Sequence, residues 1–197
     1  MKDIRIYFIG DSYVNGTGDP LYLGWPGRVC AASQTTEHSI TCYNLGVRAD
    51  TSVDILRRWE QELKARLLKP HDCHIVFSFG ANDCWIENEK KRVSPFETRK
   101  NAAKIFEQAR SLFPTLMIGP PPGIDQAEHE RRVEISTLLK QVTKNIDIPY
   151  LDLIHELHDG GLCQQEALLG DRIHPAEGGY GALADLVLAW EKWWFHQ

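Results

Sequence analysis

Residues 4–13 read IRIYFIGDSY, a short apolar run that ends in glycine, aspartate and serine. Its β-branched and aromatic residues predict a buried strand over Ile4–Ile9. A serine that directly follows such a strand lies at the carboxyl edge of the sheet, where a turn can expose its hydroxyl. The same residues also fit a plain helix cap at Ser12, and on this stretch alone both interpretations stay open.

The rest of the chain alternates strand and helix patterns. Short apolar runs predict four further strands, over residues 40–43, 74–79, 115–118 and 150–153. Apolar residues spaced by three or four predict helices over residues 53–67, 95–113, 135–146 and 180–194. Because parallel strands need crossover connections, the alternation predicts an α/β fold, a three-layer α/β/α sandwich with a central parallel five-stranded sheet of flavodoxin-like type. Ligands of such sheets bind beyond the carboxyl ends of the strands.

The composition is that of one globular domain spanning residues 1–197. The chain is 43% apolar and 25% charged, and its net charge of −5 is spread along its length. This balance argues against binding to nucleic acid or anionic membranes, because both need a basic surface. The sequence has no pattern of a signal peptide or integral membrane segment, and its five cysteines lack CxxC spacing. We therefore expect a cytoplasmic protein with reduced thiols.

Two further loops that follow predicted strands contain candidate donors to an oxyanion. Gly46 follows the second strand, where a backbone N–H with no Cβ beside it suits such a donor. Asn82 follows the third strand, and its amide can point to the same place. Each has an ordinary alternative: a glycine turn before a capped helix for Gly46, and turn chemistry for Asn82.

An acid–base pair stands near the end of the chain. Asp171 and His174 are three positions apart, ahead of a helix that Pro175 can start. This spacing can place the carboxylate on the imidazole Nδ1 and leave Nε2 free to take a proton from a hydroxyl. The alternative is a simple surface hydrogen bond.

Taken together and in this order, the four segments resemble the conserved blocks of the SGNH/GDSL hydrolase superfamily, which is named after Ser, Gly, Asn and His. Here these residues are Ser12, Gly46, Asn82 and His174, and the resemblance covers about residues 4–180. It implies a single SGNH hydrolase domain over the whole chain.

The resemblance also implies a serine esterase that uses no metal and no other cofactor. Ser12 would attack the carbonyl of a small-molecule ester, His174 would accept its proton, and Asp171 would orient His174. The N–H groups of Ser12 and Gly46 and the side-chain amide of Asn82 would hold the oxyanion.

Other residues near these blocks are candidates for substrate contact. Trp25 lines an acyl pocket in one interpretation and packs on the core in another. Arg48 meets an anionic substrate group or is only a surface charge beside the next helix. Trp85 follows the Asn82 block, and Tyr13 stands where the GDSL label has leucine.

Two other functions remain open. An acyltransferase would use the same triad and pass the acyl group to an alcohol other than water. A non-catalytic flavodoxin-like binding module would need no Asp171–His174 pair, and the loop after the first strand lacks a phosphate-binding glycine pattern. The histidine-containing stretches 71–74 and 155–159 match no standard zinc spacing, so we expect no metal site.

The aromatic C-terminus bears on self-association. Trp193 and Phe195 fall outside the helical stripe that ends near Trp194. They therefore predict a partly exposed aromatic patch, which favours a homo-oligomer.

Overall fold

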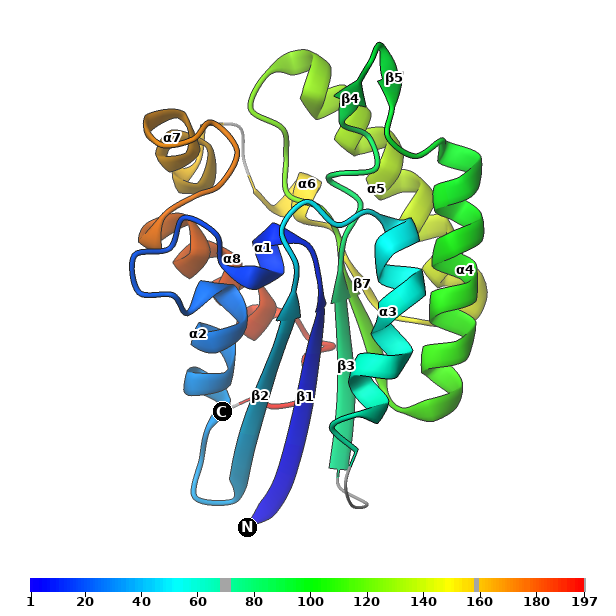
Figure 1. Cartoon of the computed structure of the whole chain (residues 1–197). Helices are drawn as coiled ribbons and strands as arrows, with labels where there is room; N and C mark the ends of the chain where they lie inside the picture. The colour runs from blue at the N-terminus through cyan, green and yellow to red at the C-terminus, as the bar shows by residue number, and fades with distance from the viewer. Residues whose placement is uncertain (68–71, 158–159, 197) are drawn as a thin grey trace.

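The central element is a five-stranded parallel sheet. The computed structural model describes residues 1–67, 72–157 and 160–196. The strands of the sheet are β1 (Lys2–Gly10), β2 (His38–Gly46), β3 (Asp72–Ser78), β6 (Thr115–Ile118) and β7 (Tyr150–Leu151). Their order is β2-β1-β3-β6-β7, and all neighbouring pairs are parallel (Figure 1). This is the flavodoxin-like order, so the predicted fold class is confirmed.

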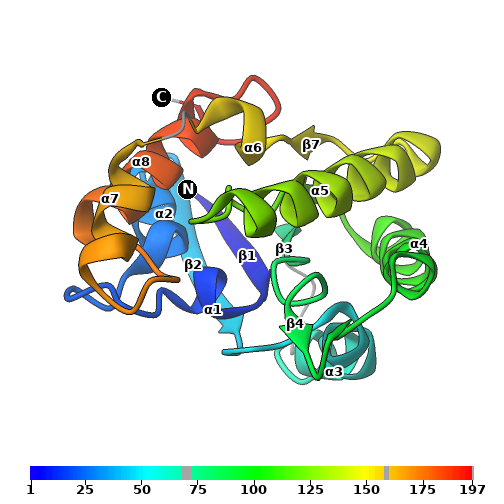
Figure 2. The same ribbon diagram turned by 90° about the horizontal axis from the view of Figure 1, so that it is seen from above.

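Helices cover both faces of the sheet (Figure 2). On one face lie α2 (Gly24–Ser33) and α8 (Glu177–Ala189), with α7 (Leu162–Leu169) packed on α8. The other face carries α3 (Ser52–Lys64), α4 (Pro95–Leu112) and α5 (Gln126–Ile146). Two one-turn helices, α1 (Ser12–Asn15) and α6 (Leu153–Glu156), follow β1 and β7. The result is the expected three-layer sandwich.

Strand β1 contributes to the core on both faces of the sheet. Ile4, Ile6 and Phe8 belong to the core cluster under α2 and α8, whereas Tyr7 and Ile9 belong to the cluster under α3, α4 and α5. All five side chains are fully buried. A strand covered on both faces reads as a continuous apolar run, which is why residues 4–9 carry so clear a signal.

A serine–proline pair marks the start of α4. Ser94 precedes the helix, its Oγ accepts a hydrogen bond from the Glu97 N–H at 3.2 Å, and Pro95 is the first helical residue. The Glu97 carboxylate accepts in return from the Ser94 N–H and Oγ. This reciprocal cap satisfies donors that the first helical turn leaves unpaired.

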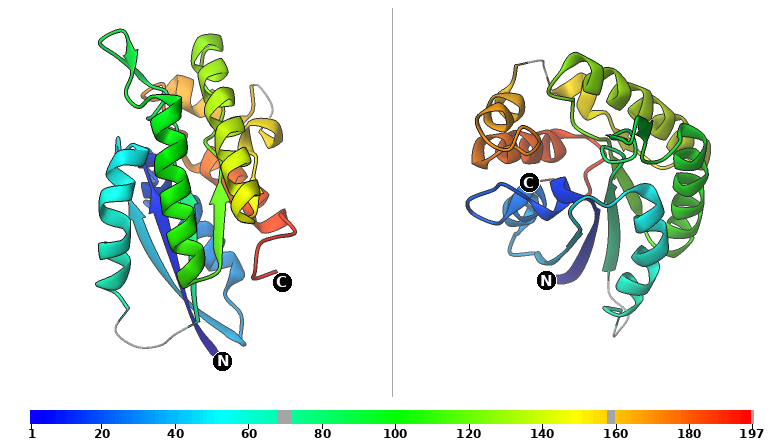
Figure 3. Two further views of the ribbon diagram at one scale, coloured as in Figure 1. Left: turned by 90° about the vertical axis from the view of Figure 1, so that its right-hand side faces the viewer. Right: turned by 45° about the horizontal axis from the view of Figure 1, so that its top comes forward.

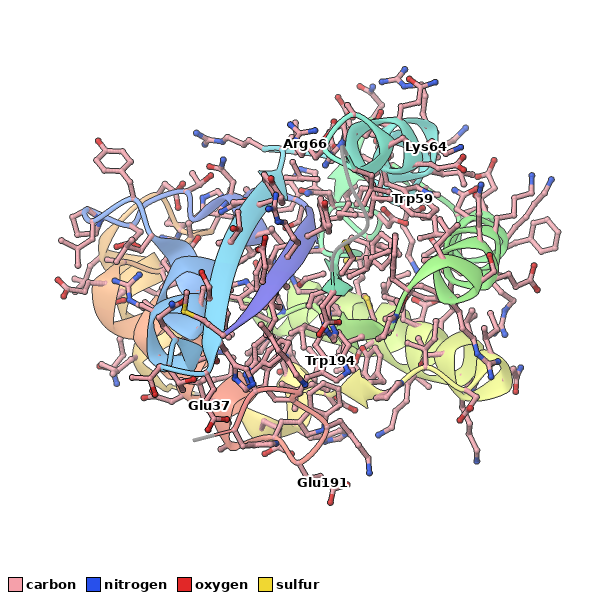
Figure 4. All side chains as sticks on the ribbon, turned by 90° about the horizontal axis from the view of Figure 1, so that it is seen from below. Glu37, Trp59, Lys64, Arg66, Glu191 and Trp194 are labelled. Atoms are coloured by element: carbon pink, nitrogen blue, oxygen red, sulfur yellow. The ribbon has the colours of Figure 1, made fainter. Side chains whose placement is uncertain are left out.

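The C-terminal segment differs from its prediction. Helix α8 ends at Ala189, and the chain then folds back so that Trp193 and Phe195 are only 1% and 6% exposed. Trp193 donates from Nε1 to Ser33 Oγ at 3.0 Å. In the view from below, Trp194 lies against the body of the molecule while Glu191 points outward (Figure 4). The prediction of an exposed aromatic patch is wrong, because these rings complete the core instead.

Two strands that the sequence pattern did not indicate form a small hairpin. β4 (Ile86–Glu87) and β5 (Lys90–Lys91) pair antiparallel and project from the top of the molecule (Figure 3). The two turn residues, Asn88 and Glu89, both have left-handed backbones with φ of 49° and 63°. Such turns are usually marked by Asn-Gly or Asp-Gly, and this one lacks the glycine.

Among the helices that the structure describes, none combines the length and the apolar character needed to cross a membrane.

Candidate active site

Ser12, Asn82 and His174 gather at the carboxyl ends of the strands. Ser12 opens α1 directly after β1, and Asn82 lies in the segment after β3. His174 lies between α7 and α8. Helix α8 packs on both α2 and α7, and these helices lie on the opposite side of α1 from β3 (Figure 2). Residues far apart in the chain thus meet at the sheet edge where this fold binds ligands.

Ser12, His174 and Asp171 form a continuous hydrogen-bonded chain. His174 Nε2 lies 2.8 Å from Ser12 Oγ, and His174 Nδ1 lies 2.7 Å from Asp171 Oδ2. Asp171 Oδ1 also accepts from the backbone N–H groups of His174 and Ile173, at 2.8 and 3.0 Å. One carboxylate therefore fixes both the imidazole and the backbone that carries it.

The protonation states suit proton transfer from the serine. Burial lowers the pKa of His174 below its ordinary value, and this outweighs the raising effect of Asp171. Burial raises the pKa of Asp171, but the hydrogen bonds from His174 and Ile173 outweigh it and bring the pKa below its usual range. At neutral pH the pair is thus a carboxylate and a neutral imidazole, which can accept a proton.

A tight turn between β1 and α1 sets the position of Ser12. Gly10 has no room for a side chain, since a Cβ there would lie 1.9 Å from Ser78 O on the neighbouring strand. Asp11 is buried, and its Oδ1 accepts from the Tyr13 N–H at 3.0 Å, which caps α1. The same burial raises the pKa of Asp11 to about 7. Asp11 therefore holds the turn.

A hydrogen bond from the side-chain amide of Asn82 to the backbone fixes the position of this side chain. Its Nδ2 donates to Asp50 O at 2.9 Å, and the side chain lines the pocket beside Ser12. An amide nitrogen has two hydrogens, so one remains for a ligand. The next residue, Asp83, is fully buried and accepts from Ser52 N and Thr98 Oγ1, both at 2.7 Å. These two bonds connect the Asn82 segment to α3 and α4.

The assignment of Gly46 as an oxyanion donor needs correction. Its N–H donates to Asn44 Oδ1 at 3.0 Å, and Gly46 does not line the pocket that contains Ser12. A Cβ on Gly46 would lie 2.1 Å from Asn15 N. The glycine is needed there because strand and helix backbones come so close, and its N–H is already used.

Ala49, three residues later, was missed by sequence reasoning. It lines the pocket with Ser12 and Asn82, and its backbone is left-handed, with φ of 67°. Its carbonyl accepts from Arg92 Nη1 at 2.9 Å, whereas its N–H makes no hydrogen bond with any residue that the structure describes. A left-handed backbone is usually indicated by glycine or asparagine, so an alanine at this position does not predict the conformation.

The sequence pattern also gives no indication of the residues that surround Tyr13. The Tyr13 hydroxyl donates to Ile173 O at 2.6 Å and accepts from Arg132 Nη1 at 3.1 Å. Arg132 on α5 is 1% exposed, and its Nη2 lies 2.5 Å from Glu128 Oε1. The Tyr13 ring also contacts the His174 ring, with centroids 5.4 Å apart. This network supports the backbone on which His174 sits.

The pocket beside Ser12 has a volume of about 230 Å³. Its lining includes Arg48 and Trp85, as expected for candidate substrate-binding residues, and their contact with substrate stays a prediction. Trp25 does not line it. Trp25 is 2% exposed and packs edge-on against Phe8 in the core, with ring centroids 5.3 Å apart. The assignment of Trp25 to substrate binding is therefore wrong, because α2 turns this ring toward β1.

The histidine-containing stretches show no metal site within the described residues. His71, His158 and Asp159 lie outside those residues. Within the part of the chain that the structure describes, no three His, Cys, Asp or Glu side chains are grouped as metal ligands. His74 pairs with Asp72 at 3.0 Å and packs on the rings of Trp194 and Phe195.

Several solved structures share this fold. A catalytic mutant of Axe2, an acetylxylan esterase from Geobacillus stearothermophilus, superposes with a TM-score of 0.78 at 18% identity, covering 98% of this chain and 96% of the other. A lipase/acylhydrolase from Enterococcus faecalis has a TM-score of 0.74 at 25% identity, covering 95% and 93%. A member of the lipolytic G-D-S-L family from Veillonella parvula has a TM-score of 0.73 at 21% identity, covering 94% and 96%.

No curated protein matches the chain by sequence. The model of the GDSL-like Lipase/Acylhydrolase family, in contrast, matches residues 8–182. This span contains Ser12, Asn82, Asp171 and His174. The chain therefore belongs to the GDSL-like lipase/acylhydrolase family and is a carboxylic ester hydrolase of that family.

Proposed function

We propose that this protein is a serine esterase that cleaves small carboxylic esters through an acyl-enzyme on Ser12. The observation that carries the proposal is the position of His174, whose two ring nitrogens lie within 2.8 Å of Ser12 Oγ and 2.7 Å of Asp171 Oδ2. This is the geometry in which a carboxylate orients an imidazole that activates a hydroxyl.

In the first half of the reaction, Ser12 Oγ attacks the ester carbonyl carbon and its proton passes to His174 Nε2. The tetrahedral intermediate collapses when the C–O bond to the alcohol breaks, and the alcohol leaves with the proton from His174. In the second half, His174 takes a proton from water, which attacks the acyl-enzyme. The acid is released, and Ser12 regains its proton from His174.

The negative charge of the tetrahedral intermediate needs fixed donors. We assign this role to the N–H of Ser12, the second amide hydrogen of Asn82 and the N–H of Ala49. Ser12 is the first residue of α1, so its N–H has no partner within the helix. Ala49 and Asn82 line the same pocket as Ser12, and the Ala49 N–H is unoccupied among the described residues. Such preorganised donors often contribute most to the rate.

The small pocket favours short acyl groups. Its volume of about 230 Å³ lies below the range of roughly 300–1,000 Å³ that is usual for sites holding larger ligands. The acetyl group that the Geobacillus stearothermophilus esterase removes from xylan is of the size this pocket would take.

The test is hydrolysis of p-nitrophenyl esters from acetate to decanoate by the wild type and Ser12→Ala, with EDTA present throughout. We expect turnover to be greatest for the shortest esters and to fall by at least about 10³-fold in Ser12→Ala. The same turnover in both proteins would contradict the proposal. Adding alcohols or sugars as acceptors and analysing the acyl products distinguishes hydrolysis from acyl transfer.

A further inference from the structure

The pocket beside Ser12 is rich in cationic side chains, although the chain as a whole carries a net charge of −5. Arg48, Arg92 and Arg132 line it from three segments: the loop after β2, the residue after β5, and α5. Among the lining residues that the structure describes, there is no aspartate or glutamate. A cleft lined by one sign of charge concentrates ligands of the opposite sign.

Arg132 does not contribute a free charge to this pocket. It is 1% exposed, it forms an ion pair with Glu128 at 2.5 Å, and it donates to Pro121 O at 3.0 Å. Its charge is thus balanced inside the protein. We assign Arg132 to the support of Tyr13 and leave it out of ligand binding.

Arg48 has the opposite character. Its side chain is 64% exposed, and the carboxylate paired with it, that of Asp171, lies 3.9 Å away, beyond hydrogen-bond distance. That same Asp171 oxygen already accepts from His174 Nδ1 at 2.7 Å. The guanidinium therefore stands at the pocket beside the triad with its donors still available.

Arg92 lies close to Arg48 and is held in place. Its Nη1 donates at 2.9 Å to the carbonyl of Ala49, which is the residue next to Arg48. Its backbone N–H donates to Trp85 O at 2.9 Å. Glu87 lies 3.7 Å from its Nε, and the Glu87 side chain is 66% exposed. Solvent weakens such a pair. Asp54 and Asp83 also interact electrostatically with Arg92, so its positive charge is partly offset.

We propose that Arg48 and Arg92 bind an anionic oxygen group, a carboxylate or a phosphate, that the ester substrate carries. Guanidinium groups match both anions through paired N–H donors, and two of them at one rim hold the anion while the ester reaches Ser12. The substrate class is then an anionic short-chain ester. This inference rests on the proposed esterase function.

The test compares two acetate esters of nearly equal size, 4-acetoxybenzoate, which is anionic, and 4-acetoxybenzamide, which is neutral. For the wild type at low salt we expect kcat/KM to be about tenfold higher for the benzoate, the factor that one charged hydrogen bond supplies. The ratio should fall toward one in Arg48→Gln and Arg92→Gln, and Arg48→Lys should retain part of it. Added salt should lower it as well.

The matched control is Arg57→Gln. Arg57 lies on α3 outside the pocket, and its side chain is 81% exposed. We expect this variant to keep the wild-type ratio, because it removes the same charge elsewhere. Serine-dependent turnover of both probes at equal rates, unchanged in the double variant of Arg48 and Arg92, would overturn the anion site and leave the esterase function intact.

Binding is measured separately on Ser12→Ala, so that the inference does not depend on turnover. Titration calorimetry with benzoate, phenyl phosphate and benzamide should give millimolar or tighter binding of at least one anion and none of the amide. The two anions show whether carboxylate or phosphate is preferred. Binding that persists when Arg48 and Arg92 are both replaced by glutamine, or no binding of either anion, would refute the proposal even if all esters are cleaved.

Discussion

Tyr13 shows how one hydroxyl can support the position of His174, the proposed general base, without a hydrogen bond to its ring. It connects Ile173 O, directly before His174, to the buried cation of Arg132. We expect Tyr13→Phe, which keeps the ring and loses the hydroxyl, to lower kcat on p-nitrophenyl acetate roughly tenfold with little change in KM, because the imidazole is less well aligned.

Tyr7→Phe is the control for that experiment, because Tyr7 lies in the core away from the pocket. Its kcat should match that of the wild type. If Tyr13→Phe raises KM and leaves kcat unchanged, Tyr13 contacts substrate and does not position His174.

The pH dependence of the reaction follows from the state of His174. In the proposed mechanism His174 must be neutral to accept a proton, and burial lowers its pKa below 6.5, so activity should persist to lower pH than an ordinary histidine allows. We expect kcat/KM for p-nitrophenyl acetate to rise with pH through a midpoint below 6.5 and then to level off.

Removing the carboxylate provides the internal check on this profile. Asp171 raises the pKa of His174, so the residual activity of Asp171→Asn should show a midpoint lower still. A wild-type midpoint above about 7 would show that another group controls the reaction.

At the scale of elements, the contact between Thr98 on α4 and Asp83 connects a packed helix to the Asn82 segment. Thr98→Val keeps the shape but removes the hydroxyl that donates to buried Asp83 Oδ2 at 2.7 Å. We expect it to lower the free energy of unfolding by about 1–3 kcal/mol in urea titrations and to reduce kcat, since Asn82 is held less firmly.

Thr98→Ser retains the donor and serves as the matched variant. It should retain most of the stability and kcat. Full stability and kcat in the valine variant, with a loss in the serine variant, would assign the effect to packing of the methyl group, and the hydrogen bond from α4 to Asp83 would then have no role in holding Asn82.

A residue pattern predicts structure well where the residue type has one dominant structural role. Strands β3 and β6 are predictable because their residues are buried on both faces, whereas β2 is mostly half-exposed. Ser12 and His174 stand out as polar residues beside apolar patterns, and their catalytic roles stay a prediction. Gly46 was misread because a glycine can serve either an exposed N–H or a close backbone approach, and only the contact with Asn15 decides between them. Arg132 reads as an ordinary helical residue, and its partner Tyr13 is 119 residues away.

At the scale of the whole molecule, one end of the sheet carries the pocket and the other end carries an aromatic cluster that stabilises the fold. The carboxyl ends of the strands hold the pocket, while the aromatic C-terminal segment packs around His74 and His38 near their amino ends. We expect Trp193→Ala to lower the free energy of unfolding by about 3–5 kcal/mol, measured by denaturant titration, because a fully buried ring and its bond to Ser33 are lost.

Trp85→Ala gives the contrasting result. Trp85 is 41% exposed and lines the pocket, so its replacement should change KM on esters and leave stability nearly unchanged. A change of kcat per folded molecule in Trp193→Ala would mean that packing of the C-terminal aromatic residues affects the pocket at the other end of the sheet.

The hydrogen bond between Ser12 and His174 joins residues that are 162 positions apart. During translation Ser12 therefore emerges early and His174 much later, about 10–30 s afterwards at ordinary rates of synthesis. Throughout that interval the Ser12 hydroxyl lacks its hydrogen-bond partner His174 Nε2. The contact between Ser12 and His174 therefore forms only after the segment between α7 and α8 has been synthesised and has packed beside α1.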